Sequence, residues 1–328
     1  MIGTIKTRSA ARVFGLALCI ASLATGSSCK AAPSRPGVPE PRLLPGDHER
    51  TLRVGGRERS YIVHVPPSFR QDEPTPLVLA FHGGATNARS HMEYCGLNDK
   101  ADGAGFLVAY PNGTGRLPRV LTFNAGNCCG YAMDHDVDDV AFVRALLADL
   151  RSEARIDAGR IFATGMSNGA MMAYLLASEM ADEIAAIAPV AGPMGTESAS
   201  PSEPVSVIHF HGTEDHNAPF EGGRGDGLSD TDFYSVRHSI DNWIALDQCP
   251  TSEVREELPD IADDGTHVIR HTYGPGAGGA EVILIEIVGG GHTWPGKDVR
   301  RGSLGRATHD ISANDMMWEF FERHPKAR

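Results

Sequence analysis

The segment GMSNG at residues 165–169 places one serine between two glycines, after an apolar stretch and before a run of helix-forming residues. At a sharp strand-to-helix turn, this pattern exposes a serine hydroxyl as a nucleophile, and the next backbone N–H faces a developing oxyanion. In a chain with 37 glycines the pattern also arises by chance, so other residues have to support it. We take Ser167 as the candidate nucleophile and the Asn168 N–H as a candidate oxyanion donor.

Two further segments offer an acid and a base. Asp215 follows the apolar run VSVIHFHG and can orient an imidazole, with Glu214 and Asp226 as competing carboxylates. His292 follows three consecutive glycines, which leave room for a loop to bring its ring to Ser167. A hydroxyl, an imidazole and a carboxylate together carry out acyl transfer, so we predict Ser167, His292 and Asp215 as the catalytic residues.

The segment FHGGATN, residues 81–87, offers a second oxyanion donor. Its glycines let backbone N–H groups approach a substrate oxygen, and we favour the N–H of Gly84. We expect the flanking His82 and Ala85 to contact substrate. His209 and His211 would share one face of a strand, but the sequence supplies no further metal ligands beside them, so we predict no metal site. Acyl transfer by the residues named above needs no organic cofactor either, and we predict none.

The elements that must position these residues alternate between strand and helix. Residues 51–66 predict a hairpin with Gly55 and Gly56 at its turn, and residues 75–84 predict a buried strand that ends in glycines. A long loop is expected over 112–136. Further strands are expected at 106–113, 160–165, 184–192, 205–212, 267–273 and 280–291, and helices at 88–104, 138–154, 168–180, 233–247 and 312–324. The fold class is therefore α/β: a single domain over residues 48–325 with a mostly parallel sheet and helices on both faces.

The N-terminal residues differ from the rest of the chain. Basic side chains precede the apolar run at 13–24, small residues follow it, and the run is too short to span a bilayer. Residues 1–28 are therefore predicted to be a signal peptide, residues 29–47 a Pro-rich linker, and the protein to be secreted or periplasmic. Attachment to a lipid through Cys29 is the alternative.

Charge and cysteine content limit the partners. The formal net charge of −12 argues against nucleic acid as a partner, and we expect no transmembrane segment in the mature chain. Four cysteines of the expected domain predict one or two disulfides in an exported protein: Cys95, Cys128, Cys129 and Cys249. A ring between adjacent cysteines is strained, so we expect Cys128 and Cys129 to pair with distant partners. The exact pairing and the oligomeric state stay open.

These motifs together resemble a known family. The segments FHGGATN, YPNG, NAGNCCG, RIFATGMSNGAMMAYLLA, HFHGTEDHNAPF and GGGHTWPG are similar, in the same order, to those of polyhydroxybutyrate depolymerase-like esterases. That family stands with the feruloyl and acetylxylan esterases of carbohydrate esterase family one. The resemblance extends over residues 48–323 and implies an α/β-hydrolase fold with Ser167, Asp215 and His292 as its triad. It also implies that Trp294 lines the substrate cleft.

The sequence thus predicts a secreted serine esterase that needs no cofactor. Its expected substrates are short hydroxyalkanoate, polyhydroxybutyrate-type or aryl esters, small or polymeric, cleaved through an acyl-enzyme. Two alternatives are kept. One is a feruloyl or acetylxylan esterase that acts on plant polysaccharide, and the other is a non-catalytic protein that binds ligands on a hydrolase fold.

Overall fold

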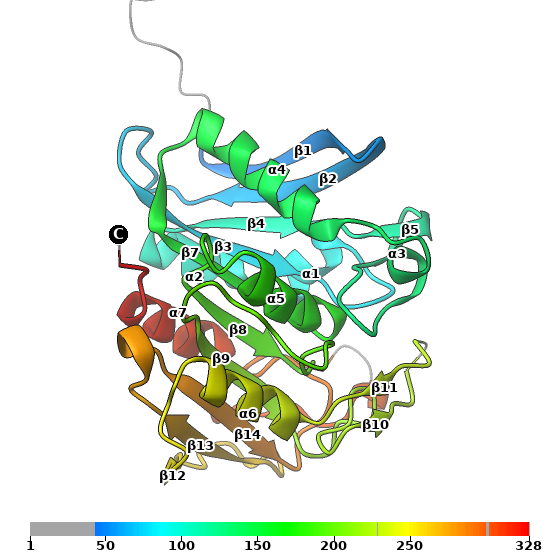
Figure 1. Ribbon diagram of the computed structural model, residues 1–328, viewed down its shortest axis with the longest axis vertical. Coiled ribbons are helices and arrows are strands. Elements are labelled where there is room, and N and C mark those ends of the chain that lie inside the picture. Colours follow the sequence, from blue (N-terminus) through cyan, green and yellow to red (C-terminus); the bar gives the residue numbers. More distant parts are fainter. Residues whose placement is uncertain (1–42, 228, 300–301, 328) are drawn as a thin grey trace, which may run out of the picture. The chain divides into compact units, whose positions relative to one another are not determined.

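The apolar runs of the sequence become the strands of one large sheet (Figure 1). The computed structural model describes residues 43–227, 229–299 and 302–327, and within them ten strands pair in the order β1-β2-β4-β3-β7-β8-β9-β14-β13-β12. Their bounds, in chain order, are β1 Gly46–Val54, β2 Arg57–Val65, β3 Thr75–Phe81, β4 Leu107–Pro111, β7 Ile156–Met166, β8 Ala186–Val190, β9 Ser206–Gly212, β12 Val254–Glu257, β13 His267–Tyr273 and β14 Val282–Val288.

The central strands run parallel and the outer ones antiparallel. From β4 through β3, β7, β8 and β9 to β14 every neighbouring pair is parallel, whereas β2 and β1 at one edge and β13 and β12 at the other are antiparallel. All residues of β3, β8 and β9 are buried, as expected for strands covered on both faces. The predicted mostly parallel sheet is confirmed.

Helices cover both faces of this sheet. Two clusters of buried side chains lie on its opposite faces: one holds residues of α4 (Asp139–Glu153), α5 (Asn168–Glu179) and α6 (Val236–Leu246), and the other holds residues of α1 (Ala88–Cys95), α2 (Leu97–Ala104) and α7 (Ala313–Arg323). Figure 1 shows α4, α5 and α6 side by side on the near face. Side chains at the helix starts support these boundaries, because Asn87, Asp138, Ser235 and Ser312 each accept a backbone N–H of the first turn.

Several predicted boundaries need correction. The helix expected at 88–104 is two helices, because Gly96 between them adopts a left-handed conformation with φ 59°. The loop expected at 112–136 contains a hairpin of β5 (Thr114–Leu117) and β6 (Val120–Thr122) and the short helix α3 (Gly130–Asp134). The remaining short elements were not predicted: β10 (Gly223–Arg224) with β11 (Asp232–Phe233), β12, and the 3-10 turns η1 (Ala277–Gly279) and η2 (Gly302–Leu304).

The predicted N-terminal segments fall mainly outside the described residues. The signal peptide at 1–28, Cys29 and most of the 29–47 linker lie there, and β1 begins at Gly46, so the last residues assigned to the linker belong to the sheet. In the described part, no helix is long and apolar enough to cross a membrane.

The cysteines differ from the expectation. The structure joins the sulfur atoms of Cys128 and Cys129 to each other, and Cys95 and Cys249 are buried and unbonded. The prediction of distant partners for Cys128 and Cys129 is therefore wrong. Cys95 belongs to the cluster under α1, on the opposite face of the sheet from the other three cysteines, which separates it from them. Cys249 shares the face of Cys128 and Cys129 but is unbonded, and its sulfur lies against the Ala280 carbonyl oxygen.

Candidate active site

The predicted site residues follow the carboxyl ends of strands in the parallel part of the sheet. Ser167 follows β7, Asp215 follows β9, His292 follows β14, and the Gly83–Gly84 turn follows β3. Figure 1 shows α3, β5, β10 and β11 gathered beyond this edge, on the side away from the C-terminus. Open α/β sheets bind their ligands at this edge, so one surface brings together residues that are far apart in the sequence.

Ser167 occupies a strained turn between β7 and α5. Its backbone has φ 57° and ψ −120°, and it is half-buried, whereas residues 161–166 and 168–174 on either side are buried. The flanking glycines are required by the close approach of β3. A Cβ on Gly165 would lie 2.7 Å from the Phe81 carbonyl oxygen, and a Cβ on Gly169 would overlap the same oxygen. The GMSNG segment therefore forms the sharp strand-to-helix turn that the sequence predicts.

Asp215 and His292 are in direct contact. The Nδ1–H of His292 donates to Asp215 Oδ2 at 2.7 Å, and both residues are buried. The other carboxylate oxygen accepts the backbone N–H groups of Asn217 and Ala218 at 2.8 and 2.9 Å. Burial alone raises the pKa of Asp215, but the charge of His292 and hydrogen bonds from His211 and His292 outweigh it and hold that pKa well below its usual range. Asp215 is therefore ionised at neutral pH.

The competing carboxylates do not reach this imidazole. Glu214 is exposed and pairs with Arg306 at 3.1 Å, and Asp226 is exposed. Of the three acids that the sequence left as alternatives, only Asp215 turns inward at the end of β9 and contacts His292. His292 Nε2 and the Ser167 hydroxyl make no hydrogen bond to any residue that the structure describes.

The glycine turn after β3 lies against the Ser167 turn. A Cβ on Gly83 would be 3.5 Å from the Ser167 Cβ, and a Cβ on Gly84 would be 3.8 Å from the Asn168 Cβ. Asn168 is the first residue of α5, so its N–H has no partner within the helix. The N–H of Ala85 donates to Leu121 O at 3.0 Å and is thereby occupied, whereas Gly84 is exposed.

His82 is not positioned to touch substrate. The buried His82 ring donates from Nδ1 to Gly83 O at 2.7 Å and accepts the Gly113 N–H at 3.0 Å. Burial lowers the pKa of His82 to about 4, so the ring is neutral, as these two bonds require. Its position corrects our expectation, because this ring holds two loops together instead of facing a ligand.

Trp294 likewise belongs to the core. Its indole is fully buried, donates to Asn314 Oδ1 at 2.9 Å and packs edge-on against His91 with ring centroids 5.4 Å apart. The expected contact of Trp294 with an open substrate cleft is therefore wrong. The chain turns inward just after His292, so the indole fills the space beneath α1 and α7.

Asn168 has a second role that the sequence did not reveal. Its buried side chain accepts the Phe123 N–H at 2.7 Å and donates to the Phe123 carbonyl at 3.0 Å. The amide thereby completes the backbone bonding of a loop residue as a neighbouring strand would. This bond fixes the segment after β6 against the start of α5, next to Ser167.

A buried ion pair secures the same loop from its other side. Arg59 of β2 contacts Asp139 of α4 at 2.5 Å, and both side chains are almost completely buried. Arg59 also donates to the Asn112 carbonyl at 3.1 Å, and Asp139 accepts the Asn124 N–H at 2.8 Å. The pair therefore holds both ends of the 112–124 segment. Sequence reasoning missed it because the two residues are 80 positions apart along the chain and no local pattern links them.

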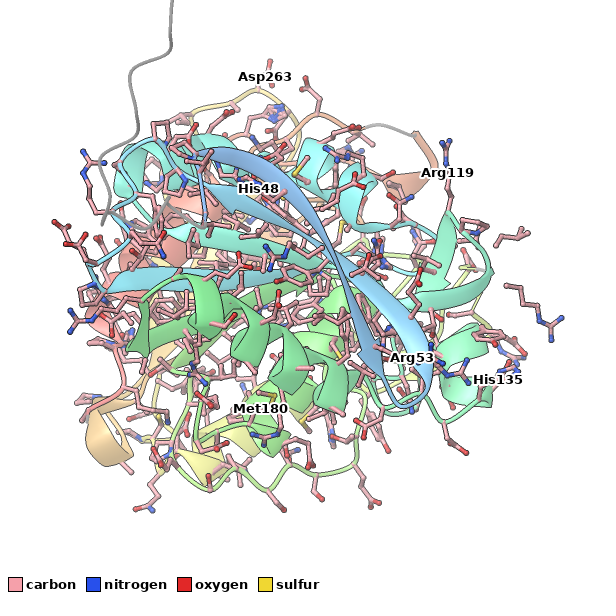
Figure 2. All side chains as sticks on the ribbon, turned by 90° about the horizontal axis from the view of Figure 1, so that it is seen from above. His48, Arg53, Arg119, His135, Met180 and Asp263 are labelled. Carbon is pink, nitrogen blue, oxygen red and sulfur yellow. A yellow bond between two sulfur atoms is a disulfide. The ribbon has the colours of Figure 1, made fainter. Side chains whose placement is uncertain are left out.

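The outer part of this loop is exposed. Figure 2 labels Arg119, in the β5–β6 turn, and His135, after α3, and both lie at the same side of the protein. Between the hairpin and β2 is a polar hollow of about 330 Å³, whose lining includes Arg57, Asn112, Thr114 and Tyr131. Leu121, which also lines it, pairs with the turn that carries Ala85 and Thr86, so the hollow adjoins the candidate oxyanion loop.

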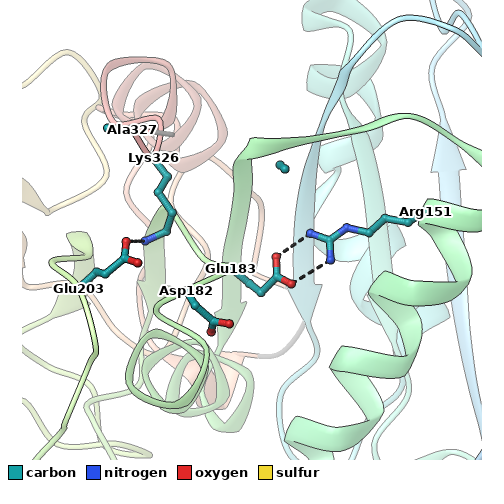
Figure 3. Close-up of a pocket in the computed structure, with 7 residues that line it drawn as sticks. Arg151, Asp182, Glu183, Glu203, Lys326 and Ala327 are labelled. Carbon is teal, nitrogen blue, oxygen red and sulfur yellow. Dashed lines mark hydrogen bonds and ion pairs between the residues drawn. The ribbon is translucent and has the colours of Figure 1, made fainter.

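A second pocket, of about 460 Å³, lies elsewhere (Figure 3). Its charged groups form ion pairs across it, with Arg151 bonded twice to Glu183 at 2.9 and 2.6 Å and Lys326 bonded to Glu203 at 2.8 Å. Glu183 and Glu203 precede β8 and β9, so this pocket is at the amino ends of the strands, away from Ser167. Among the residues that the structure describes, no group of three or more His, Cys, Asp or Glu side chains is arranged to hold a metal ion.

The fold and this strand edge define an α/β hydrolase, and comparison with known proteins gives the family. The family profile described as "Esterase PHB depolymerase" matches residues 59–219. NocK of Nocardia uniformis subsp. tsuyamanensis, a protein provisionally named an esterase, is 30% identical over 289 residues, which are 83% of this chain and 81% of NocK. The chain belongs to the PHB depolymerase esterase family and is a carboxylic ester hydrolase.

Other relatives agree with this class. Feruloyl esterase B of Piromyces equi is 30% identical over 246 residues, or 71% of this chain, and these cover only 42% of that longer protein. Among solved structures, an acetyl xylan esterase from Aspergillus awamori superposes with a TM-score of 0.56 at 14% identity and covers 84% of this chain and 99% of its own. At that identity the superposition supports the fold alone.

Proposed function

We propose that the protein is a serine esterase whose catalytic residues are Ser167, His292 and Asp215. The observation that carries the proposal is the 2.7 Å hydrogen bond between His292 and Asp215 at the strand edge that also holds the strained Ser167 turn. The carboxylate holds the imidazole with its proton on Nδ1, which leaves Nε2 free to accept a proton. The half-buried hydroxyl of Ser167 is the nucleophile that this base serves.

The proposed reaction passes through an acyl-enzyme. Ser167 Oγ attacks the ester carbonyl carbon as its proton moves to His292 Nε2, and the imidazolium then protonates the departing alcohol. The N–H groups of Gly84 and Asn168 stabilise the negative oxygen of the tetrahedral intermediate. Water, deprotonated by His292, then cleaves the acyl-enzyme and regenerates the serine. No cofactor takes part in these steps.

Covalent labelling tests the assignment of the nucleophile. A fluorophosphonate probe should label the wild-type protein on Ser167, and Ser167→Ala should lose both the label and turnover of 4-nitrophenyl acetate, by about 10³-fold or more. Ser178→Ala is a matched control, because Ser178 lies near the other end of α5. Retained labelling in Ser167→Ala would place the nucleophile elsewhere.

For the substrate, we propose short hydroxyalkanoate or aryl esters, in keeping with the family to which the chain belongs. Release of hydroxybutyrate from defined oligomers, compared with release of 4-nitrophenol from short acyl esters, tests this proposal. If kcat/KM for the oligomers is well below kcat/KM for a feruloylated sugar, the proposed substrate class is wrong.

A second candidate is a feruloyl or acetylxylan esterase. The names of relatives support it, including feruloyl esterase B of Piromyces equi, and so does the polar hollow beside the oxyanion loop, because its amide and hydroxyl groups suit a sugar alcohol. Arg57→Ala together with Tyr131→Phe should then raise KM for a feruloylated sugar and leave 4-nitrophenyl acetate hydrolysis unchanged. Equal effects on both esters would argue against a sugar site in the hollow.

A further inference from the structure

Two buried histidines continue the hydrogen bonding of Asp215 into the core. His209 and His211 are separated by one residue on β9, so both rings point to the same face of the sheet, and neither exposes more than 1% of its surface. The rings lie nearly parallel, at 13°, with centroids 5.2 Å apart. No step of the proposed reaction uses either ring.

The contacts of these rings form one continuous row. The hydroxyl of Tyr174, in α5, is 2.9 Å from His209 Nδ1, and His209 Nε2 is 3.0 Å from His211 Nδ1. At the other end, His211 Nε2 is 2.8 Å from the carbonyl oxygen of Ala218 and 3.4 Å from Asp215 Oδ2. The last of these atoms is the oxygen that accepts the Nδ1–H of His292.

The acceptor at the end of the row sets the direction of every bond. A carbonyl oxygen only accepts, so His211 Nε2 carries a proton and donates it to Ala218 O. When the His211 ring carries this one proton, its Nδ1 is an acceptor, which requires His209 Nε2 to donate and His209 Nδ1 to accept from the Tyr174 hydroxyl. Burial and the neighbouring His211 lower the pKa of His209 well below its usual range, so this ring stays neutral. Both ring nitrogens of each histidine are thereby used within the protein.

We propose that His211 is a positioning residue for the Asp215 carboxylate, held in its donor tautomer by His209 and Tyr174. Its Nε2–H faces Asp215 Oδ2 and binds Ala218 O, while the Ala218 N–H binds Asp215 Oδ1, so one imidazole and one loop residue enclose the carboxylate. Fixing both oxygens fixes the plane of the carboxylate, and with it the direction of the His292 ring. This inference rests on the proposed triad and adds a reason why the acid stays aligned.

Substitution of His211 tests the role. His211→Phe keeps a ring of similar size and removes the donor, so kcat for 4-nitrophenyl acetate should fall about 10- to 100-fold, because misplacing a catalytic group by about 1 Å can cost up to about 10²-fold. The KM should change less than about twofold, because His211 does not touch substrate. The far-downfield proton resonance of the His292–Asp215 hydrogen bond should broaden or move. His211→Gln, which restores an N–H donor, should recover most of the lost kcat.

Controls separate this inference from the proposed function. His324→Phe replaces a histidine at the end of α7 and should leave kcat and the downfield resonance unchanged. If Ser167→Ala retains turnover, the proposed function itself fails. If Ser167→Ala is inactive while folded His211→Phe keeps its kcat within about twofold and its resonance unchanged, only the positioning role fails.

A more conservative variant covers the case in which His211→Phe does not fold. Tyr174→Phe removes a single oxygen from the far end of the row. It should lower kcat about two- to fivefold at constant KM and shift the downfield resonance, because the buried His209 Nδ1 then loses its donor and the row that holds His211 is weakened. An unchanged kcat together with an unchanged resonance in folded Tyr174→Phe would overturn the proposal.

Discussion

At the scale of single residues, the proposed chemistry depends on one imidazole and the groups that align it. Asp215 has all of its contacts in place: two backbone N–H groups on one oxygen, and His292 and His211 on the other. A carboxylate that accepts several hydrogen bonds stays ionised and rigid, and both properties keep the proton of His292 on Nδ1. The proposed catalytic base is therefore oriented before any substrate arrives.

Removal of this base is the first prediction. His292→Ala should lower kcat by about 10³-fold or more with little change in KM, because Ser167 then lacks a proton acceptor. Steady-state hydrolysis of 4-nitrophenyl acetate measures the loss, and circular dichroism checks that the variant is folded. A folded His292→Ala with a near wild-type rate would assign the base to another residue.

Asn168 leads to a second prediction, since its side chain and its backbone act separately. Asn168→Ala keeps the backbone N–H of the proposed oxyanion site and removes both bonds to Phe123. We expect a loss of about 1–3 kcal/mol in the free energy of unfolding, because the Phe123 N–H and carbonyl groups become unpaired. Urea denaturation measures it, and a change below the error of that method would show that water replaces the amide.

Asp247 gives a pH-dependent prediction away from the site. Burial raises its pKa from 3.8 to about 7, and its Oδ2 has no hydrogen bond in the described structure. A raised pKa in the folded state means that the proton stabilises the fold below about pH 4 and that this contribution disappears as the pH rises through about 7. In Asp247→Asn, which keeps the oxygen that accepts the Val205 N–H, unfolding free energies should fall less between these pH values than in the wild type. Identical slopes in the two proteins would contradict the prediction.

At the scale of elements, the site depends on close approach between β3, β7 and α5. The glycines at 165 and 169 allow that approach, because the Phe81 carbonyl oxygen of β3 occupies the space of a side chain at either position. Between these two glycines the chain passes from the sheet into α5 through the strained turn at Ser167. Backbone packing, and not the serine itself, therefore shapes the turn that carries the half-buried Ser167.

The ion pair between β2 and α4 supports a prediction at this scale. Asp139→Leu leaves the buried Arg59 charge without a partner and should reduce the free energy of unfolding by about 3–5 kcal/mol. The double variant Arg59→Met with Asp139→Leu should regain most of that loss, since no charge is then buried. Urea denaturation of the two variants distinguishes these outcomes. A double variant as unstable as the single one would mean that the bonds to Asn112 and Asn124 dominate.

At the scale of the whole molecule, the remaining proposal concerns export. The predicted signal peptide and the proposed disulfide between Cys128 and Cys129 both fit an oxidising compartment. Expressed with its leader in a bacterial host, the protein should reach the periplasm or the medium with an N-terminus within residues 25–29, as intact mass shows. Alkylation after denaturation without reductant should modify Cys95 and Cys249 but not Cys128 and Cys129. Modification of all four would contradict the disulfide.

The sequence by itself determined the local features of this protein. Apolar runs, and the glycines that end them, were sufficient to predict most strands and helices, and the GMSNG motif was sufficient to predict the turn at Ser167. Such local structure depends mainly on residues that are neighbours in the chain. The order of the motifs also indicated the family.

Only the tertiary structure decided which distant groups meet. It selected Asp215 over Glu214 and Asp226, turned Trp294 and His82 into the core, and joined His209, His211 and Tyr174 behind the acid. A side chain's direction at the end of a strand depends on what packs against it from other elements, and no local pattern carries that information. The proposed alignment of the site comes from such contacts, between residues that only the fold brings together.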